Sequence, residues 1–180
     1  MIDVFFRKYS FLRVKMLSSY KLQDMPTEIE RKFLVTGDYK KDACRAIPMR
    51  QGYICNGSGR TVRVRICGDR GFLTIKGPSF DGGMSRYEWE KEIPVHEASE
   101  LMELCDSGRI EKIRHLVKTG KHTFEVDEFH GDNEGLVVAE VELGSADEAF
   151  ERPSWLGEEV TGDHRYYNAS LCRNPFKNWK

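Results

Sequence analysis

The chain has 180 residues and a formal net charge of −1, and 32% of its residues are charged against 39% hydrophobic. This length suits one domain with a core of its own, because such a chain buries roughly two-thirds of its unfolded surface. The near-zero net charge argues against general nucleic-acid binding, and no apolar run is long enough for a membrane-spanning helix.

The first 24 residues differ from the rest of the chain. Phe5, Tyr9, Leu12 and Met16 recur at helical spacing in a basic context, which allows an amphipathic helix lying on a membrane surface. Basic residues interrupt every apolar stretch, so the segment lacks the continuous apolar region of a signal peptide. We favour another interpretation, in which residues 1–24 are an extension outside the fold, or the product of a wrong start codon, and residues 25–175 form the domain.

The patterned sequence opens with a strand, Glu-Ile-Glu-Arg-Lys-Phe-Leu-Val at residues 28–35. Because side chains alternate between the two faces of a strand, Glu28, Glu30 and Lys32 project from one face. Two carboxylates beside one ammonium could hold a divalent cation together with the phosphate that the cation neutralises.

Seven further strands are expected, at residues 49–55, 61–68, 71–76, 85–94, 109–118, 121–130 and 136–143. Short turns rich in Gly, Asn and Asp separate most of them, which favours antiparallel neighbours. A short helix is expected at residues 39–46. Two longer helices are expected, one from His96 towards Cys105 and one from Thr161, as its N-cap, towards Cys172. Residues 145–150 could add one helical turn.

Cysteine usage indicates a reducing compartment. The five cysteines are odd in number, widely spaced and without a C-x-x-C pair. This pattern supports neither a disulfide scaffold nor a structural zinc site. The simplest interpretation is reduced thiols, which predicts a cytoplasmic protein.

Charged side chains recur at every second position in most of the expected strands. The pairs are cationic at positions 63/65 and 112/114 and anionic at 88/90, 125/127 and 140/142. For any single strand the plainer interpretation is an amphipathic sheet with its charges in water. The segregation of cationic from anionic pairs favours an eight-stranded sheet that closes into a barrel with its charged face inward. Burying so much charge requires hydration, ion pairs, metal and an anionic ligand, so such a tunnel implies a substrate such as a polyphosphate.

The same residues resemble the CYTH superfamily, the triphosphate tunnel metalloenzymes. Glu28-Ile-Glu-Arg-Lys32 is similar to the E-x-E-x-K signature of that family. The resemblance continues in order at residues 50–53, 62–65, 73–76, 85–90, 111–114, 125–127, 139–142 and 157–161. The resemblance covers roughly residues 25–172. It is closest to the short bacterial single-domain members, which hydrolyse inorganic triphosphate. The fold that it implies is α+β, with an eight-stranded antiparallel β-barrel tunnel, a charged lumen and a few covering helices.

The resemblance also implies a linear triphosphate bound in the tunnel with Mg²⁺ or Mn²⁺ as cofactor. The cations expected to bind the phosphate oxygens are Lys32, Arg63, Arg65, Lys76, Lys112 and Arg114. The expected metal ligands are Glu28, Glu30, Glu140 and Glu142, with Asp127, Glu88 and Glu90 as further candidates. These residue types suit the task, because hard cations prefer carboxylate oxygens and phosphates prefer arginine and lysine.

Two residues are candidates for a catalytic role, Lys32 and Tyr53. Tyr53 matches a tyrosine that is linked to catalysis in the bacterial members and is often described there as a proton acceptor. Ordinary aromatic packing beside the end of a strand is an equally good interpretation of Tyr53.

The reaction implied is the hydrolysis of tripolyphosphate to diphosphate and orthophosphate. Alternatives on the same fold are a class IV-type adenylate cyclase and a thiamine or nucleoside triphosphatase, although nothing in the sequence plainly supplies a nucleobase pocket. A non-catalytic polyphosphate-binding protein ranks lower, because the carboxylates for metal are present. The expected partner is a small-molecule triphosphate, without nucleic acid or membrane, and a homodimer stays open because single-domain members often look dimeric.

Overall fold

The computed structural model describes residues 27–57, 59–80, 85–105 and 108–179, and over these residues the chain forms a nine-stranded antiparallel sheet. The strands are β1 (Thr27–Val35), β2 (Ala43–Gly57), β3 (Arg60–Cys67), β4 (Arg70–Phe80), β5 (Ser85–Ile93), β6 (Ile110–Thr119), β7 (His122–His130), β8 (Val137–Glu142) and β9 (Leu156–Glu159). The helices are α2 (Val95–Glu103) and α3 (Asn168–Leu171), with 3₁₀ turns η2 (Lys40–Asp42), η4 (Gly131–Asn133), η5 (His164–Tyr166) and η6 (Phe176–Asn178). The expected α+β class, dominated by antiparallel strands with few helices, is confirmed. Within the described residues, none of the helices has the length and apolar composition that crossing a bilayer requires.

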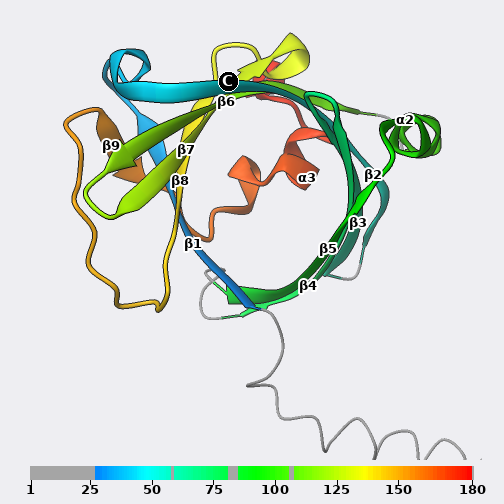
Figure 1. Cartoon of the computed structure of the whole chain (residues 1–180), viewed down its shortest axis with the longest axis horizontal. Coiled ribbons are helices and arrows are strands. Elements are labelled where there is room, and N and C mark those ends of the chain that lie inside the picture. The colour runs from blue at the N-terminus through cyan, green and yellow to red at the C-terminus, as the bar shows by residue number, and fades with distance from the viewer. Residues whose placement is uncertain (1–26, 58, 81–84, 106–107, 180) are drawn as a thin grey trace, which may run out of the picture.

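The strands follow the order β5-β4-β3-β2-β6-β7-β8-β1-β9. Strand β1 also pairs with β5, with Thr27 opposite Tyr87 and Ile29 opposite Ser85. The two ends of the eight-strand run from β5 to β1 are therefore neighbours as well. Figure 1 shows these strands curving around a common centre.

The eight expected strands all form, and the structure adds β9, which the sequence did not predict. Strand β9 pairs with β1, where Val35 lies opposite Leu156. The helix expected at residues 39–46 is wrong. Only the single turn η2 forms there, and the chain then enters β2, where Ala43 pairs with Val117 of β6. Pairing along the edge of a long strand outweighs a short helix, which is marginal without tertiary packing.

The expected helix from Thr161 to Cys172 is broken in two, into η5 and α3. Its N-cap is Asp163, whose carboxylate accepts a hydrogen bond from the backbone N–H of Arg165 at 3.0 Å. The Thr161 hydroxyl instead accepts a hydrogen bond from the backbone N–H of Lys32 at 3.0 Å, which ties this segment to β1. Residues 145–150 contain a turn and no helix, so that expectation was also wrong.

The apolar face of the sheet points outward and is covered by two different elements. On one side, helix α2 packs Ala98 and Met102 onto Val64 and Ile66 of β3. On the other side, the segment between β8 and β9 packs Trp155 against a cluster that includes Phe33, Phe124 and Val141. The resemblance implied a few covering helices, and of the two helices in the described residues α2 alone takes this role.

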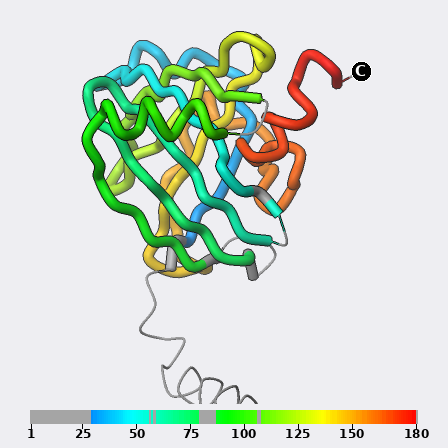
Figure 2. The backbone as a smooth tube through the Cα atoms, turned by 90° about the vertical axis from the view of Figure 1, so that its right-hand side faces the viewer, coloured from blue at the N-terminus to red at the C-terminus, as the bar shows by residue number. Residues whose placement is uncertain are grey.

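Helix α3 lies instead on the charged face of the sheet. Leu171 is fully buried against Ile110, Phe129, Leu136 and Val138, at the end of the sheet where β7 turns into β8. Figure 1 shows α3 within the outline of the curved sheet. In Figure 2, turned by 90°, the C-terminal residues in red lie at one end of the strands. Helix α3 therefore packs into one end of the space that the strands surround.

Candidate active site

A cavity of about 740 Å³ lies on the charged face of the sheet. Its charged lining residues are Glu30, Lys32, Arg63, Arg65, Lys76, Glu88, Glu90, Arg114, Glu125, Glu140 and Glu142. Several of these are buried, with Lys32 only 5% exposed and Arg63 and Arg114 only 7% exposed. Lysine and arginine are almost never fully buried unless they are paired. The charged face therefore points away from bulk solvent, as the segregation of cationic from anionic pairs in the sequence predicted.

The deepest ion pairs join β6 to β7. Asp127 is 1% exposed and accepts hydrogen bonds from Nε and Nη2 of Arg114, both at 2.7 Å, and from the Lys112 ammonium. Burial would raise the pKa of Asp127, but Arg114 and Lys112 outweigh burial and lower the pKa. Burial lowers the pKa of Lys112 to about 8, against the opposing pull of Asp127. This cluster holds the Arg114 guanidinium in one orientation.

Glu140 of β8 extends this first network towards β1. Its carboxylate accepts hydrogen bonds from Arg114 at 3.0 Å and from the Lys32 ammonium, and Lys32 also lies 3.0 Å from Glu30. Arg114 forms a further ion pair with Glu125. Burial would raise the pKa of Glu140, but Lys32 and Arg114 hold it well below its usual range. The first network is thus a continuous chain of alternating charges across four strands, β6, β7, β8 and β1.

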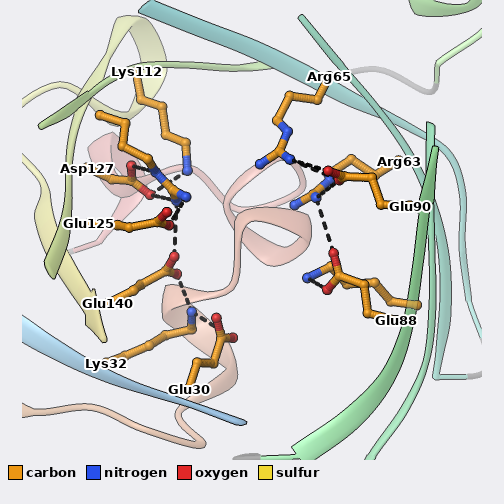
Figure 3. A network of polar contacts seen from close by, with 12 residues as sticks. Glu30, Lys32, Arg63, Arg65, Glu88, Glu90, Lys112, Glu125, Asp127 and Glu140 are labelled. Carbon is orange, nitrogen blue, oxygen red and sulfur yellow. Dashed lines mark hydrogen bonds and ion pairs between the residues drawn. The ribbon is translucent and has the colours of Figure 1, made fainter. Parts of the chain in front are cut away.

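A second network covers β3, β4 and β5. The Glu90 carboxylate accepts hydrogen bonds from the Thr74 hydroxyl at 2.6 Å, from Arg65 at 2.9 Å and from Arg63 at 3.2 Å. Glu88 forms ion pairs with Lys76 and, at 3.7 Å, with Arg63. Figure 3 shows the two networks facing each other from opposite sides of the site. An anion bound between them would lie within reach of cations from both sides.

Two of the three arginines of β3, Arg63 and Arg65, present donors that the described residues do not use. The Nε–H groups of Arg63 and Arg65 are buried and have no hydrogen-bond partner among the described residues. Buried donors of this kind are rare, since nearly all find a partner in the protein or in ordered water. Guanidinium N–H groups match phosphate oxygens in geometry and charge. These two orphaned donors therefore favour a phosphate ligand at β3.

Tyr53 of β2 lines the cavity and is 8% exposed. Its hydroxyl oxygen accepts a hydrogen bond of 3.0 Å from Nε2 of Gln51, which is 1% exposed. We did not predict Gln51 as a site residue. The available signal was strand parity, because residues 51 and 53 share a face.

Carboxylates that could hold a metal gather where β1 meets β8. Glu30 and Glu142 lie directly opposite each other in this strand pair, and both line the cavity. Like charges directly opposite in a sheet are destabilising, and a divalent cation between them would relieve that repulsion. The donor set therefore fits a hard cation. In the described part of the chain, no three His, Cys, Asp or Glu side chains already converge as a metal site.

The other predicted metal ligands stand differently. The Glu28 side chain lies outside the described residues, although its backbone pairs with Arg86 of β5. Glu88, Glu90 and Asp127 form ion pairs with lysine or arginine.

The predicted phosphate-binding cations that line the cavity are Lys32, Arg63, Arg65, Lys76 and Arg114. Lys112 is 3% exposed and does not line it, but reaches the site through Asp127.

The C-terminal segment contributes lining residues that the sequence did not predict. They are His164 of η5, Tyr167 between η5 and α3, and Asn168, Ala169 and Ser170 of α3. The rings of His164 and Tyr167 lie edge to face, with centroids 4.8 Å apart. No alternation marks this segment, so only its packing into the end of the sheet brings it to the site.

Comparison with known proteins gives concordant matches. The family model of the CYTH domain matches residues 26–170. An inorganic triphosphatase of Acetivibrio thermocellus is 50% identical over 157 residues, which cover 87% of this chain and 99% of the relative. An inorganic triphosphatase of Nitrosomonas europaea is 40% identical over 150 residues, covering 81% and 97%. The crystal structure of the inorganic triphosphatase NE1496 matches with a TM-score of 0.60 at 38% identity, again covering 81% and 97%.

Proposed function

The chain belongs to the CYTH domain family, and on this premise we propose that it hydrolyses inorganic triphosphate to diphosphate and orthophosphate. The observation that carries the proposal is the cavity between two facing ion-pair networks, which has orphaned arginine donors in its wall. The match to inorganic triphosphatases over nearly their whole length supports the same substrate here.

The proposed site is the lumen of a closed eight-stranded tunnel. The pairing of β1 with β5 supports closure, because it joins the two ends of the run of eight strands. Closing a sheet leaves its inner face in contact with enclosed side chains and water. Inside such a tunnel, charge–charge interactions are stronger than at an open surface.

In this proposal the triphosphate lies between the two networks. Arg63 and Arg65 donate their Nε–H groups to phosphate oxygens from one side, and Lys32 and Arg114 bind from the other. Each of these cations is now paired with a carboxylate, so phosphate oxygens replace or join partners that are already in place. Phosphoryl transfer depends mainly on such positioning and charge stabilisation, with little covalent work for the protein.

The family is typically metal-dependent, and we propose Glu30 and Glu142, with Glu28 and Glu140, as the residues that would hold Mg²⁺ or Mn²⁺. A bound divalent cation would neutralise charge on the triphosphate and make a coordinated water a better nucleophile. The carboxylates of Glu30 and Glu140 also position the Lys32 ammonium, with which both form ion pairs.

We propose that Tyr53 positions the attacking water and does not remove its proton. The Tyr53 hydroxyl oxygen already accepts a hydrogen bond from Gln51, which makes it a poorer proton acceptor. Geometry comes before pKa in judging a general base, and here the geometry favours an orienting role.

The domain that carries this function is proposed to be residues 25–175. The family match begins at residue 26, which supports the proposal that residues 1–24 are not part of the fold. Residues 1–24 lie outside the described residues. We propose a reducing, cytoplasmic compartment from the odd number and wide spacing of the five cysteines.

A substrate panel tests the proposal. The purified full chain is incubated with tripolyphosphate, diphosphate, ATP or thiamine triphosphate, in Mg²⁺, in Mn²⁺ and in excess chelator. We expect one orthophosphate and one diphosphate per tripolyphosphate with a divalent cation, and no turnover in chelator. Cyclic AMP formation from ATP would point to a cyclase, and tight binding without turnover in either metal would point to a polyphosphate-binding protein.

A further inference from the structure

The C-terminal segment presents fixed side chains to the cavity. Leu171, at the end of α3, is fully buried in the cluster of Ile110, Phe129, Leu136 and Val138. Beyond it, the side-chain oxygen of Asn133 accepts a hydrogen bond from the backbone N–H of Phe176 at 2.9 Å. The segment is therefore held at Leu171 and at Phe176, which fixes the position of the residues just before Leu171 in the site.

Two polar groups of this segment lack a hydrogen-bond partner in the described part of the chain. The Tyr167 hydroxyl and the Asn168 carbonyl oxygen are buried, and neither has a hydrogen-bond partner among the described residues. Both residues line the cavity. Leaving a buried polar group unsatisfied is costly, so an orphaned pair beside a cavity calls for an explanation. A ligand or its bound water, present in the working enzyme, would supply the missing partners.

Beyond these two polar groups the surroundings become apolar. The cluster around Leu171 consists of apolar side chains, and the Lys112 ammonium that lies over its Phe129 ring is already paired with Asp127. An ionised phosphate would pay a large desolvation cost there. A chain of linked phosphates can therefore extend as far as Tyr167 and Asn168 and no further in this direction, whereas arginine and lysine line the cavity on its other sides.

We propose that Tyr167 and Asn168 form a subsite for the free end of the phosphate chain, so that the enzyme recognises the terminus of a linear polyphosphate. This inference rests on the proposed function. The Tyr167 hydroxyl donates a hydrogen bond to an oxygen of the terminal phosphate. Asn168 accepts a hydrogen bond from a water molecule bound to that phosphate. Tyr167 is thus a specificity-determining residue of the reaction.

A linear and a cyclic ligand of equal phosphate number separate end recognition from general charge attraction. Binding of tripolyphosphate and of cyclic trimetaphosphate is measured by calorimetry in chelator, where we expect no turnover. Tyr167→Phe should weaken the binding of linear tripolyphosphate about tenfold, the size expected for one hydrogen bond to a charged group, and leave ring binding unchanged. Equal weakening for both ligands, or no change for either, would overturn the inference.

The matched control is Tyr166→Phe. The Tyr166 ring packs against Trp179, with centroids 5.2 Å apart, and does not line the cavity. This variant loses the same hydroxyl one residue away and should bind both ligands as the wild type does. Thermal melts of both variants establish that they fold. If the wild-type chain binds tripolyphosphate but releases no phosphate in Mg²⁺ or Mn²⁺, the proposed function fails while the binding comparison still decides the end subsite.

Discussion

Asp127 shows how single residues make the charged interior stable. Its carboxylate satisfies two buried cations at once, Arg114 through two hydrogen bonds and Lys112 through one. Desolvating three charged groups is costly, and this geometry offsets the cost only while all three are present. Asp127 is therefore as much a structural residue as a candidate for ligand binding.

Replacing Asp127 by Asn should destabilise the protein by about 3–5 kcal/mol, because Lys112 loses the carboxylate that it pairs with and Arg114 keeps only Glu125 and Glu140. Urea unfolding of the wild type and of Asp127→Asn measures this loss. Added tripolyphosphate, which supplies negative charge to the same region, should stabilise the variant more than it stabilises the wild type. A loss below about 1 kcal/mol would contradict this account of Asp127.

An exposed ion pair provides the control for that experiment. Glu92 pairs with Arg70 at the surface, where their side chains are 52% and 58% exposed. Solvent-exposed pairs contribute only about 0–1 kcal/mol. Glu92→Gln should therefore have nearly the same urea midpoint as the wild type, both without and with tripolyphosphate.

Strand alternation was sufficient to group most of the charged lining, because parity decides which residues of a strand share a face. The segregation of cationic from anionic pairs then favoured the inner position for that face, where the structure has Lys32, Arg63 and Glu140. Parity cannot decide depth or partners, so it did not predict that Lys112 lies behind the cavity, bonded to Asp127. Tyr167 belongs to no strand and carried no signal.

At the scale of elements, the fit of helix α2 on the sheet depends on two glycines. A Cβ added to Gly71 of β4 would lie 2.6 Å from the Cβ of Ala98 and 2.9 Å from the carbonyl oxygen of Ile93. A Cβ added to Gly52 of β2 would lie 2.8 Å from the Sγ of Cys105. The helix and Cys105, which follows it, therefore come closest to β4 and β2 at two positions where those strands carry no side chain.

We expect Gly71→Ala to destabilise the protein by about 1–3 kcal/mol, because the methyl group overpacks the contact between α2 and β4. Gly57→Ala in β2 is its control, since an added Cβ there meets no atom of the described chain within 4 Å. That second variant should be neutral or slightly stabilising. Thermal unfolding compares the two, and equal melting temperatures would contradict the packing argument.

The sequence predicted helix or strand correctly wherever the apolar periodicity extended over a whole element. The prediction failed where pairing with another strand decided the structure. Helix α2 and all eight expected strands formed because their apolar positions repeat over whole elements. The segment at residues 39–46 became the start of β2, because β6 offers it a partner strand. Strand β9 is four residues long and depends on β1 for its pairing, so its own sequence could not reveal it.

At the scale of the whole molecule, the sheet is inverted relative to a common amphipathic sheet. Its apolar face is outside and covered by α2 and by the segment that contains Trp155, and its charged face is inside. The interior charges nearly balance one another through the two networks. A polyanion therefore enters a site whose cations are already held in place, which lowers the reorganisation needed for catalysis.

The direction in which the charged face points is tested most directly by one pair of arginine variants. Arg63 is 7% exposed and lines the cavity, whereas Arg70 on the neighbouring strand is exposed and pairs with Glu92. We measure kcat/KM for tripolyphosphate with Mg²⁺ in Arg63→Gln and in Arg70→Gln. We predict a loss of about a hundredfold or more for Arg63→Gln and wild-type values for Arg70→Gln. A folded Arg63→Gln variant with wild-type kcat/KM would contradict the account.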